Sequence, residues 1–110
     1  MALNAIYLAD KSALARFPVP AVAARLRPLL EDGELASCAI VDLEVLYSSR
    51  NLAHYELARR GQHRVPIPDL IVSAAALVSD LVVLHYDAYF ERITAAGGAR
   101  HEWVVPKGTI

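Results

Sequence analysis

The sequence is poor in cysteine and in aromatic residues. Its 110 residues include one cysteine, Cys38, which excludes a disulfide within the chain and is expected to be a small buried apolar residue. Aromatic residues make up 7% of the chain and apolar residues 55%. Such a chain is too apolar to remain disordered. Its wealth of Ala, Val and Leu favours helices packed on a sheet over a sandwich of sheets.

Neither sign of charge dominates. Lys and Arg total 11, Asp and Glu total 12, and the net charge is -1. A nucleic-acid partner therefore requires a local site, because there is no general basic surface. The longest apolar region, residues 70–84, is interrupted by two serines and Asp80 and is too short and polar to span a membrane. No basic stretch precedes the first apolar run, so we expect a cytoplasmic protein without a membrane partner.

Short apolar runs alternate with helical patterns along the chain. The expected strands are residues 5–9, 35–40, 81–86 and 102–105. The expected helices are residues 20–31, 43–49, 51–61, 70–79 and 88–96. Alternate prolines predict that Val65-Pro66-Ile67-Pro68 is extended and that Asp69 caps the next helix. Strands that are apolar throughout indicate an α/β fold with a parallel sheet covered on both faces.

Four acidic residues occupy the edge at which such sheets bind ligands. Asp10 and Asp87 follow the first and third expected strands, whereas Glu44 and Asp69 lie where helices begin. Strand ends and the helix starts that follow them share one edge, so these carboxylates are expected to converge. Taken singly, each has an ordinary explanation as a helix cap, a turn residue or a solvated side chain.

Clustered carboxylates repel one another unless a cation neutralises them. Ligands made of oxygen alone favour Mg²⁺, or Mn²⁺ in its place, and the four histidines do not have zinc-binding spacing. Such an ion lowers the pKa of a bound water, which can then attack a phosphodiester. The acids therefore predict metal-dependent hydrolysis of phosphodiesters, with either one ion or two.

Five short blocks follow one another in order along nearly the whole chain. They are Tyr7–Ala13, Val41–Glu44, Pro66–Ile71, Leu84–Asp87 with Phe90 and Arg92 after it, and Glu102–Val105. Together they resemble the signature segments of the VapC toxins, which are PIN-domain ribonucleases. The resemblance implies a three-layer α/β/α PIN-like fold with a short central parallel sheet. It also implies a Mg²⁺-dependent endoribonuclease of a type II toxin–antitoxin system, which cleaves tRNA or rRNA, forms a homodimer and is bound by a VapB-type antitoxin.

By position, the resemblance makes Asp10, Glu44, Asp69 and Asp87 the catalytic and metal-binding quartet. Asp10 and Asp69 are the strongest candidates for metal ligands. Ser12, two residues after the first acid, is implied as the hydroxyl that orients it. The alternative role for Ser12 is that of a helix cap.

The sequence departs from the family pattern in three places. Lys11 replaces a threonine that many relatives carry, and it either contacts a substrate phosphate or pairs with an acid. Tyr89 stands where relatives often have a further Asp. We expect residues 1–110 to form a single domain, in which the helical region around residues 50–64 is shorter than in the family. In relatives this region helps to build the groove, the dimer and the antitoxin site.

Two other hypotheses compete with an active nuclease. The first is a truncated or degenerate PIN domain that binds antitoxin or RNA without efficient cleavage. The second is a flavodoxin-like signalling domain with an acidic Mg²⁺ pocket, which requires an Asp pair where this chain has the single Asp10.

Trp103 is expected to pack in the core, and His85 to be a buried, hydrogen-bonded histidine and not a catalytic base.

Overall fold

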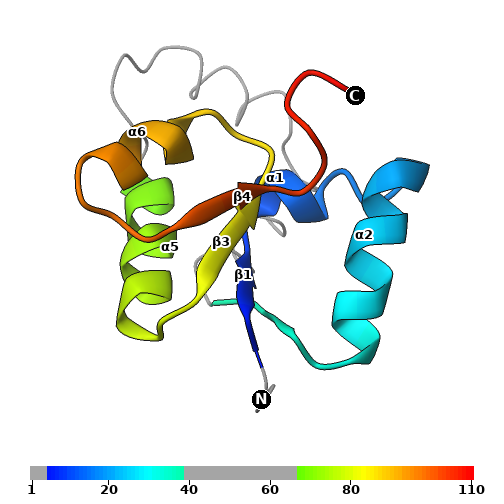
Figure 1. Cartoon of the computed structure of the whole chain (residues 1–110), viewed down its shortest axis with the longest axis horizontal. Helices are drawn as coiled ribbons and strands as arrows, with labels where there is room; N and C mark the ends of the chain where they lie inside the picture. The colour runs from blue at the N-terminus through cyan, green and yellow to red at the C-terminus, as the bar shows by residue number, and fades with distance from the viewer. Residues whose placement is uncertain (1–4, 39–66) are drawn as a thin grey trace.

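The computed structural model describes residues 5–38 and 67–110 (Figure 1). Their four short strands form one sheet in the order β2-β1-β3-β4, and every neighbouring pair is parallel. The strands are β1 (Tyr7–Ala9), β2 (Leu35–Ala36), β3 (Val82–His85) and β4 (His101–Trp103). The helices are α1 (Lys11–Leu14), α2 (Pro20–Glu31), α5 (Ile67–Val78) and α6 (Tyr89–Ala95). None of these helices is long and apolar enough to cross a membrane.

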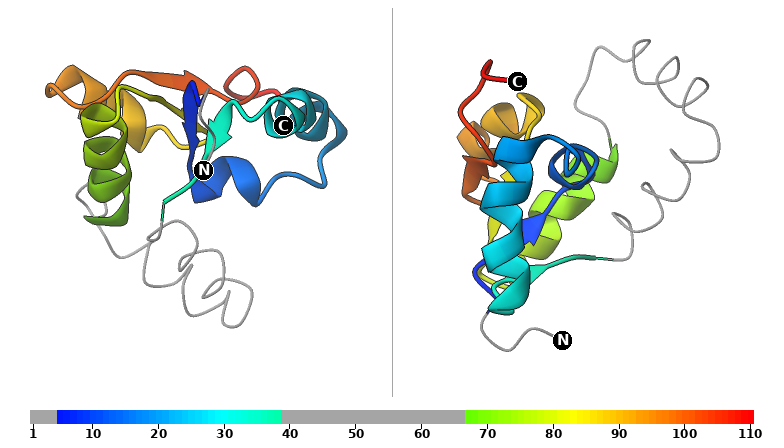
Figure 2. Two further views of the ribbon diagram at one scale, coloured as in Figure 1. Left: turned by 90° about the horizontal axis from the view of Figure 1, so that it is seen from below. Right: turned by 90° about the vertical axis from the view of Figure 1, so that its right-hand side faces the viewer.

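Helices α5 and α6 cover one face of the sheet (Figures 1 and 2). Leu8 of β1 and Val83 of β3 are paired in register, and both belong to a buried cluster on this face. The same cluster contains Val72 and Ala76 of α5 and Phe90 of α6. Val72 and Ala76 are four residues apart and therefore lie on the same side of their helix.

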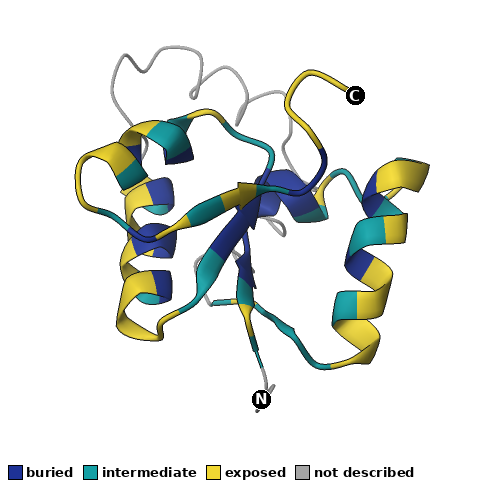
Figure 3. Ribbon diagram, in the orientation of Figure 1, coloured by how far each residue is buried: buried dark blue, intermediate teal, exposed yellow. Residues whose placement is uncertain are grey.

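Helices α1 and α2 cover the opposite face. Leu84 follows Val83 in β3 and so points the other way, because successive side chains of a strand alternate. It packs with Ala13 of α1 and with Val22 and Leu26 of α2, all of them fully buried. Figure 3 shows that the outer side of α2 is exposed, as expected of a helix that covers a sheet. The chain thus has the three-layer α/β/α architecture with a short parallel sheet that the resemblance implied.

Several elements lie close to where the sequence placed them. Helix α2 has the predicted bounds: Pro20 occupies its first turn, and it ends before Asp32-Gly33. The predicted β2 was a buried strand over residues 35–40. The observed strand is Leu35–Ala36 and is only half-buried, because it lies at the edge of the sheet next to β1. The helices expected at residues 43–49 and 51–61 lie outside the described residues.

The start of α5 corrects a prediction. Ile67 and Pro68 were expected to be extended, but they form the first turn of the helix. Proline is tolerated there because the first amide groups of a helix have no acceptor within it. Asp69 is therefore inside the first turn and does not precede the helix. A carboxylate in this turn is favoured by the positive end of the helix dipole.

Helix α1 was not predicted. It has four residues, too few for a hydrophobic period to be recognised. Asp10 is its N-cap, with an extended backbone (φ -85°, ψ 157°) and a side chain that accepts the backbone N–H of Ser12. The capping role considered for Ser12 thus belongs to Asp10, and this local geometry decides how the carboxylate is presented.

Candidate active site at the carboxyl edge of the sheet

The chain leaves β1 and β3 toward opposite faces of the sheet. After β1 it enters α1 and α2, whereas after β3 it enters α6 on the other face. Neighbouring parallel strands whose connections diverge in this way mark the ligand-binding edge of an α/β sheet. Asp10 directly follows β1, and Asp87 lies two residues after β3. The fold therefore places both of these acids at the carboxyl edge of the sheet.

Asp10 is 2% exposed, and the two oxygens of its carboxylate differ in their surroundings. Oδ2 accepts two hydrogen bonds from Ser12, from the backbone N–H at 3.0 Å and from the hydroxyl at 2.6 Å. Oδ1 is buried and accepts no hydrogen bond from the part of the chain that is described. A buried carboxylate oxygen without a donor is costly, and a cation at this position would offset that cost.

Burial raises the pKa of Asp10, and the negative charge of Asp87 acts in the same direction. The hydrogen bonds from Ser12 lower the pKa and so oppose this rise. Asp10 and Asp87 follow neighbouring parallel strands, so both carboxylates lie at the same edge of the sheet. A pair of this kind binds a cation more readily than either acid alone.

Ser12 connects the two strand ends. Its hydroxyl donates to Asp10 and accepts the backbone N–H of Tyr86 at 2.9 Å. Tyr86 is the first residue after β3 and lies 74 positions further along the chain. The Ser12 hydroxyl therefore holds both the Asp10 carboxylate and the segment that carries Asp87.

Asp87 is half-buried and is fixed on both sides. Its Oδ1 accepts the backbone N–H of Tyr89 at 3.1 Å, which closes a local turn before α6. Its own backbone N–H donates to Nδ1 of His85 at 3.0 Å. The position of Asp87 is thus defined by its own turn and by the end of β3.

Asp69 is 4% exposed and lies in the first turn of α5. Helix α5 runs antiparallel to β3, so that its first turn lies at the carboxyl edge of the sheet (Figure 1). Glu44 lies outside the described residues. Among residues 5–38 and 67–110, no three His, Cys, Asp or Glu side chains are placed to hold a metal ion together. The four-acid metal site therefore remains a prediction.

Lys11 is 7% exposed, although it was considered as a contact for a substrate phosphate. Burying an ammonium group is costly unless it is paired with an acceptor or an acid. Its burial thus favours the alternative in which Lys11 pairs within the protein. Tyr89, the other departure at this edge, is half-buried and donates the backbone N–H that binds Asp87.

His85 is fully buried and hydrogen-bonded, as predicted. Its Nε2 lies 2.8 Å from Nδ1 of His101, a partner that sequence reasoning missed. Burial lowers the pKa of His85 from 6.5 to about 4, and the nearby His101 adds to this effect. The ring also packs against Phe90 and Trp103, with centroids 4.8 and 4.9 Å away. Trp103 is only half-buried and belongs to neither buried cluster, so it packs beside the core and not within it as expected.

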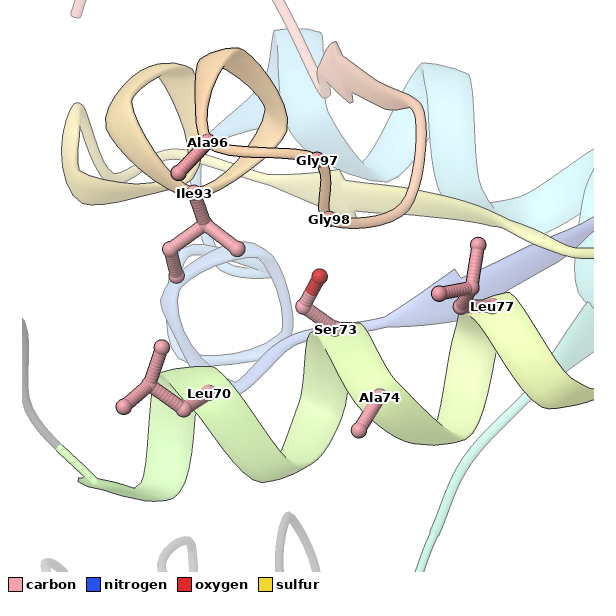
Figure 4. A pocket seen from close by; sticks show the side chains of 8 residues that line it. All are labelled: Leu70, Ser73, Ala74, Leu77, Ile93, Ala96, Gly97 and Gly98. Carbon is pink, nitrogen blue, oxygen red and sulfur yellow. The ribbon is translucent and has the colours of Figure 1, made fainter.

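A separate apolar pocket of about 300 Å³ lies between α5, α6 and the Gly97-Gly98 turn (Figure 4). Its lining residues are Leu70, Ser73, Ala74, Leu77, Ile93, Ala96, Gly97 and Gly98. The hydroxyl of Ser73 already accepts the backbone N–H of Ala99 at 3.0 Å. The pocket contains no acid or base and is distinct from the acidic edge.

A parallel α/β sheet with acids at its carboxyl edge is the arrangement that the resemblance to PIN domains implied. No family model matches the sequence. The chain is 38% identical to the ribonuclease VapC51 of Mycobacterium tuberculosis, over 94% of the chain and 96% of that relative. It is 41% identical to the ribonuclease VapC21 of the same organism, with the same coverage, and 31% identical to its ribonuclease VapC18, over 96% and 99%. The chain belongs to the VapC family of PIN-domain ribonucleases.

The alignments with VapC51 and VapC21 extend over 132 and 133 positions, more than the 110 residues of this chain. These relatives therefore carry residues within the aligned span that this chain lacks. The expectation of a shortened helical region at residues 50–64 concerns residues that are not described, and it stays a prediction.

Proposed function

We propose that this protein is a Mg²⁺-dependent endoribonuclease that hydrolyses RNA phosphodiester bonds as the toxin of a VapBC system. Its relatives are named ribonucleases, and they cover nearly the whole chain. The observation that carries the metal-dependent chemistry is the buried Oδ1 of Asp10, next to the charge of Asp87. The proposed substrate is tRNA or rRNA in the cytoplasm, and the proposed partners are a VapB-type antitoxin and a second copy of the chain.

The residues at this edge fit a hard divalent cation that keeps part of its water shell. Mg²⁺ is commonly held by one or two carboxylates together with several waters. Asp10 and Asp87 would hold the ion, with Asp69 and the predicted Glu44 completing the acidic site. When bound, the ion would supply a water of lowered pKa and would neutralise charge on the scissile phosphate.

The protein's own residues prepare this site before any cation binds. Ser12 holds Oδ2 of Asp10, so that Oδ1 would be the oxygen that binds the cation. The turn that Asp87 forms with Tyr89 fixes its Oδ1. Such preorganisation lowers the cost of binding, because the carboxylates need not be reoriented.

The experiment compares the wild-type protein with Asp10→Asn and Asp87→Asn. Asp32→Asn is the matched control, because Asp32 is an exposed acid after α2 at the opposite edge of the sheet. Expressed alone in bacteria, the wild type and the control should arrest growth. As purified proteins with Mg²⁺ they should cleave total RNA at least about a hundredfold faster than the two site variants. EDTA should abolish cleavage. Equal RNA cleavage by the wild type and both site variants would refute the proposed nuclease activity.

One observation favours the alternative function, namely the residues that VapC51 and VapC21 have and this chain lacks. In this alternative the domain binds antitoxin or RNA without efficient turnover. It predicts that the wild type is as inactive as Asp10→Asn but still binds a VapB-type antitoxin encoded beside its gene. Co-purification of the two proteins, measured together with RNA cleavage, distinguishes this function from that of an active toxin.

A further inference from the structure

Two consecutive backbone amides that follow β3 are held by side chains. The N–H of Tyr86 donates to the hydroxyl of Ser12 at 2.9 Å, and the N–H of Asp87 donates to Nδ1 of His85 at 3.0 Å. The first contact belongs to the Ser12 bridge described above. The second contact, from Asp87 to His85, reaches the backbone of one of the acids of the proposed site.

The hydrogen bonds define the protonation state of His85. A backbone N–H can only donate, so Nδ1 accepts and carries no proton. A ring whose Nδ1 carries no proton holds its single proton on Nε2. Nε2 therefore donates to Nδ1 of His101, 2.8 Å away. The order of donors runs from the Asp87 amide to His85, and from His85 to His101.

The ring that accepts the Asp87 amide is held firmly. His85 is fully buried, and its ring packs against those of Phe90, His101 and Trp103, with centroids 4.8 to 5.0 Å away. A ring enclosed in this way cannot turn its Nδ1 away without disturbing several neighbours. The acceptor is thus fixed in position at the end of β3, two residues before the acid.

We infer that His85 is a positioning residue for Asp87, that its Nδ1 fixes the backbone of this acid, and that His101 selects the tautomer that makes Nδ1 an acceptor. The inference rests on the proposed function, because it gives Asp87 a role in binding the cation. Partners that orient metal-site residues in this way commonly contribute ten- to hundredfold to metal affinity or activity. A purely structural histidine would contribute to stability alone.

Two amide substitutions separate positioning from packing. The amide of asparagine reaches about as far as Nδ1 of histidine, and the longer amide of glutamine about as far as Nε2. His85→Asn therefore keeps an acceptor for Asp87, whereas His85→Gln keeps only the contact toward His101. We expect kcat for RNA cleavage and Mn²⁺ affinity, measured by calorimetry, to be about tenfold or more lower in His85→Gln than in His85→Asn. KM for RNA should differ little.

Thermal unfolding of the two variants supplies the control for packing. Both replace a buried ring by a smaller amide, so both should lower Tm by similar amounts. If kcat and Mn²⁺ affinity fall equally in both variants, His85 has only a structural role and the inference is wrong. A larger loss in His85→Asn than in His85→Gln would contradict it as well.

The tautomer gives a test that needs no RNA. In ¹⁵N spectra of the wild-type protein at pH 7, His85 should show a protonated Nε2 and a bare Nδ1. His101→Leu, which removes the acceptor, should reduce this preference, whereas His101→Asn keeps an acceptor near the position of Nδ1. A protonated Nδ1 in the wild type would overturn the inference directly.

Failure of the inference can be told apart from failure of the proposed function. If Asp10→Asn and Asp87→Asn cleave RNA like the wild type, the nuclease proposal fails whatever His85 does. If these variants are inactive while His85→Gln equals His85→Asn in kcat and Mn²⁺ affinity, the nuclease proposal stands and the role of His85 falls.

Discussion

The hydroxyl of Ser12 lies 2.6 Å from Oδ2 of Asp10, and both side chains are buried at the end of β1. The other carboxylate oxygen of Asp10, Oδ1, is buried and accepts no hydrogen bond from the described residues. Because the same hydroxyl accepts the N–H of Tyr86, one side chain joins the ends of two neighbouring strands. The acidic edge is therefore organised by a small polar residue as well as by its acids.

Replacing Ser12 by alanine should weaken both stability and catalysis. The change leaves the part-buried N–H of Tyr86 without its acceptor, at a cost of about 1 kcal/mol. It also removes one of the two hydrogen bonds that hold Oδ2 of Asp10, so RNA cleavage should fall by about ten- to hundredfold. Urea denaturation and single-turnover cleavage measure the two effects. Ser12→Thr, which keeps the hydroxyl, should recover part of each, and a Ser12→Ala protein with unchanged kinetics would contradict this account.

Asp10→Asn should stabilise the protein in the absence of a cation. The folded state raises the pKa of Asp10 through burial and the charge of Asp87, so the ionised carboxylate is a burden above that pKa. In the wild type this burden grows as pH rises from the unfolded value of 3.8 through the raised folded value. At pH 7 with EDTA, Tm of the variant should exceed that of the wild type. Added Mg²⁺ should raise Tm of the wild type alone, and a lower Tm for the variant in EDTA would contradict the argument.

His85 should make the protein less stable in mild acid. Its pKa falls from 6.5 in the unfolded chain to about 4 in the fold, so only the unfolded state takes up a proton between these values. Stability contributed by the neutral ring is complete above pH 6.5 and is lost as pH falls toward 4, by at most about 3 kcal/mol. Urea denaturation at pH 7, 6 and 5 measures this slope. His85→Asn cannot titrate and should flatten the slope, whereas an equal slope in both proteins would assign the loss to other groups.

Gly98→Ala should destabilise the fold through close contacts. A Cβ at this position would lie 2.5 Å from Cγ2 of Ile93, 2.8 Å from its carbonyl oxygen and 2.8 Å from the hydroxyl of Ser73 (Figure 4). Relief requires the α6 backbone to move, and overpacking of this kind costs about 1–3 kcal/mol. The midpoint of urea unfolding measures the effect. Adding Ser73→Ala to Gly98→Ala removes only the contact with the Ser73 hydroxyl. The two contacts with Ile93 remain, so the double variant should not regain wild-type stability.

Tyr86→Phe should loosen residues 106–110 without unfolding the domain. The Tyr86 hydroxyl accepts the N–H of Gly108 at 2.9 Å and donates to the carbonyl of Ile110 at 3.3 Å. These bonds are exposed, so their loss should lower the free energy of unfolding by no more than about 1 kcal/mol. Cleavage by trypsin after Lys107 should be several times faster in the variant. Equal cleavage rates would show that the Lys107–Glu91 ion pair, at 3.1 Å, holds this segment without Tyr86.

Much of the fold and part of the site were set by patterns that act over a few residues. Pro20 at the start of α2 and Asp32-Gly33 after its end define that helix locally, and continuous apolar runs identify β1 and β3. The acids Asp10 and Asp87 follow these runs, so their place at the carboxyl edge of a parallel sheet is predictable without coordinates. The blocks around them likewise indicated the VapC family, which the relatives confirm.

Tertiary structure alone decided which strands are neighbours and which side chains therefore meet. The order β2-β1-β3-β4 places β3 next to β1, and only this contact brings Ser12 to the amide of Tyr86. The meeting of His85 with His101 depends likewise on the register between β3 and β4. Local preference cannot encode such contacts, because the free energy that selects them comes from burying apolar faces between segments far apart in the chain.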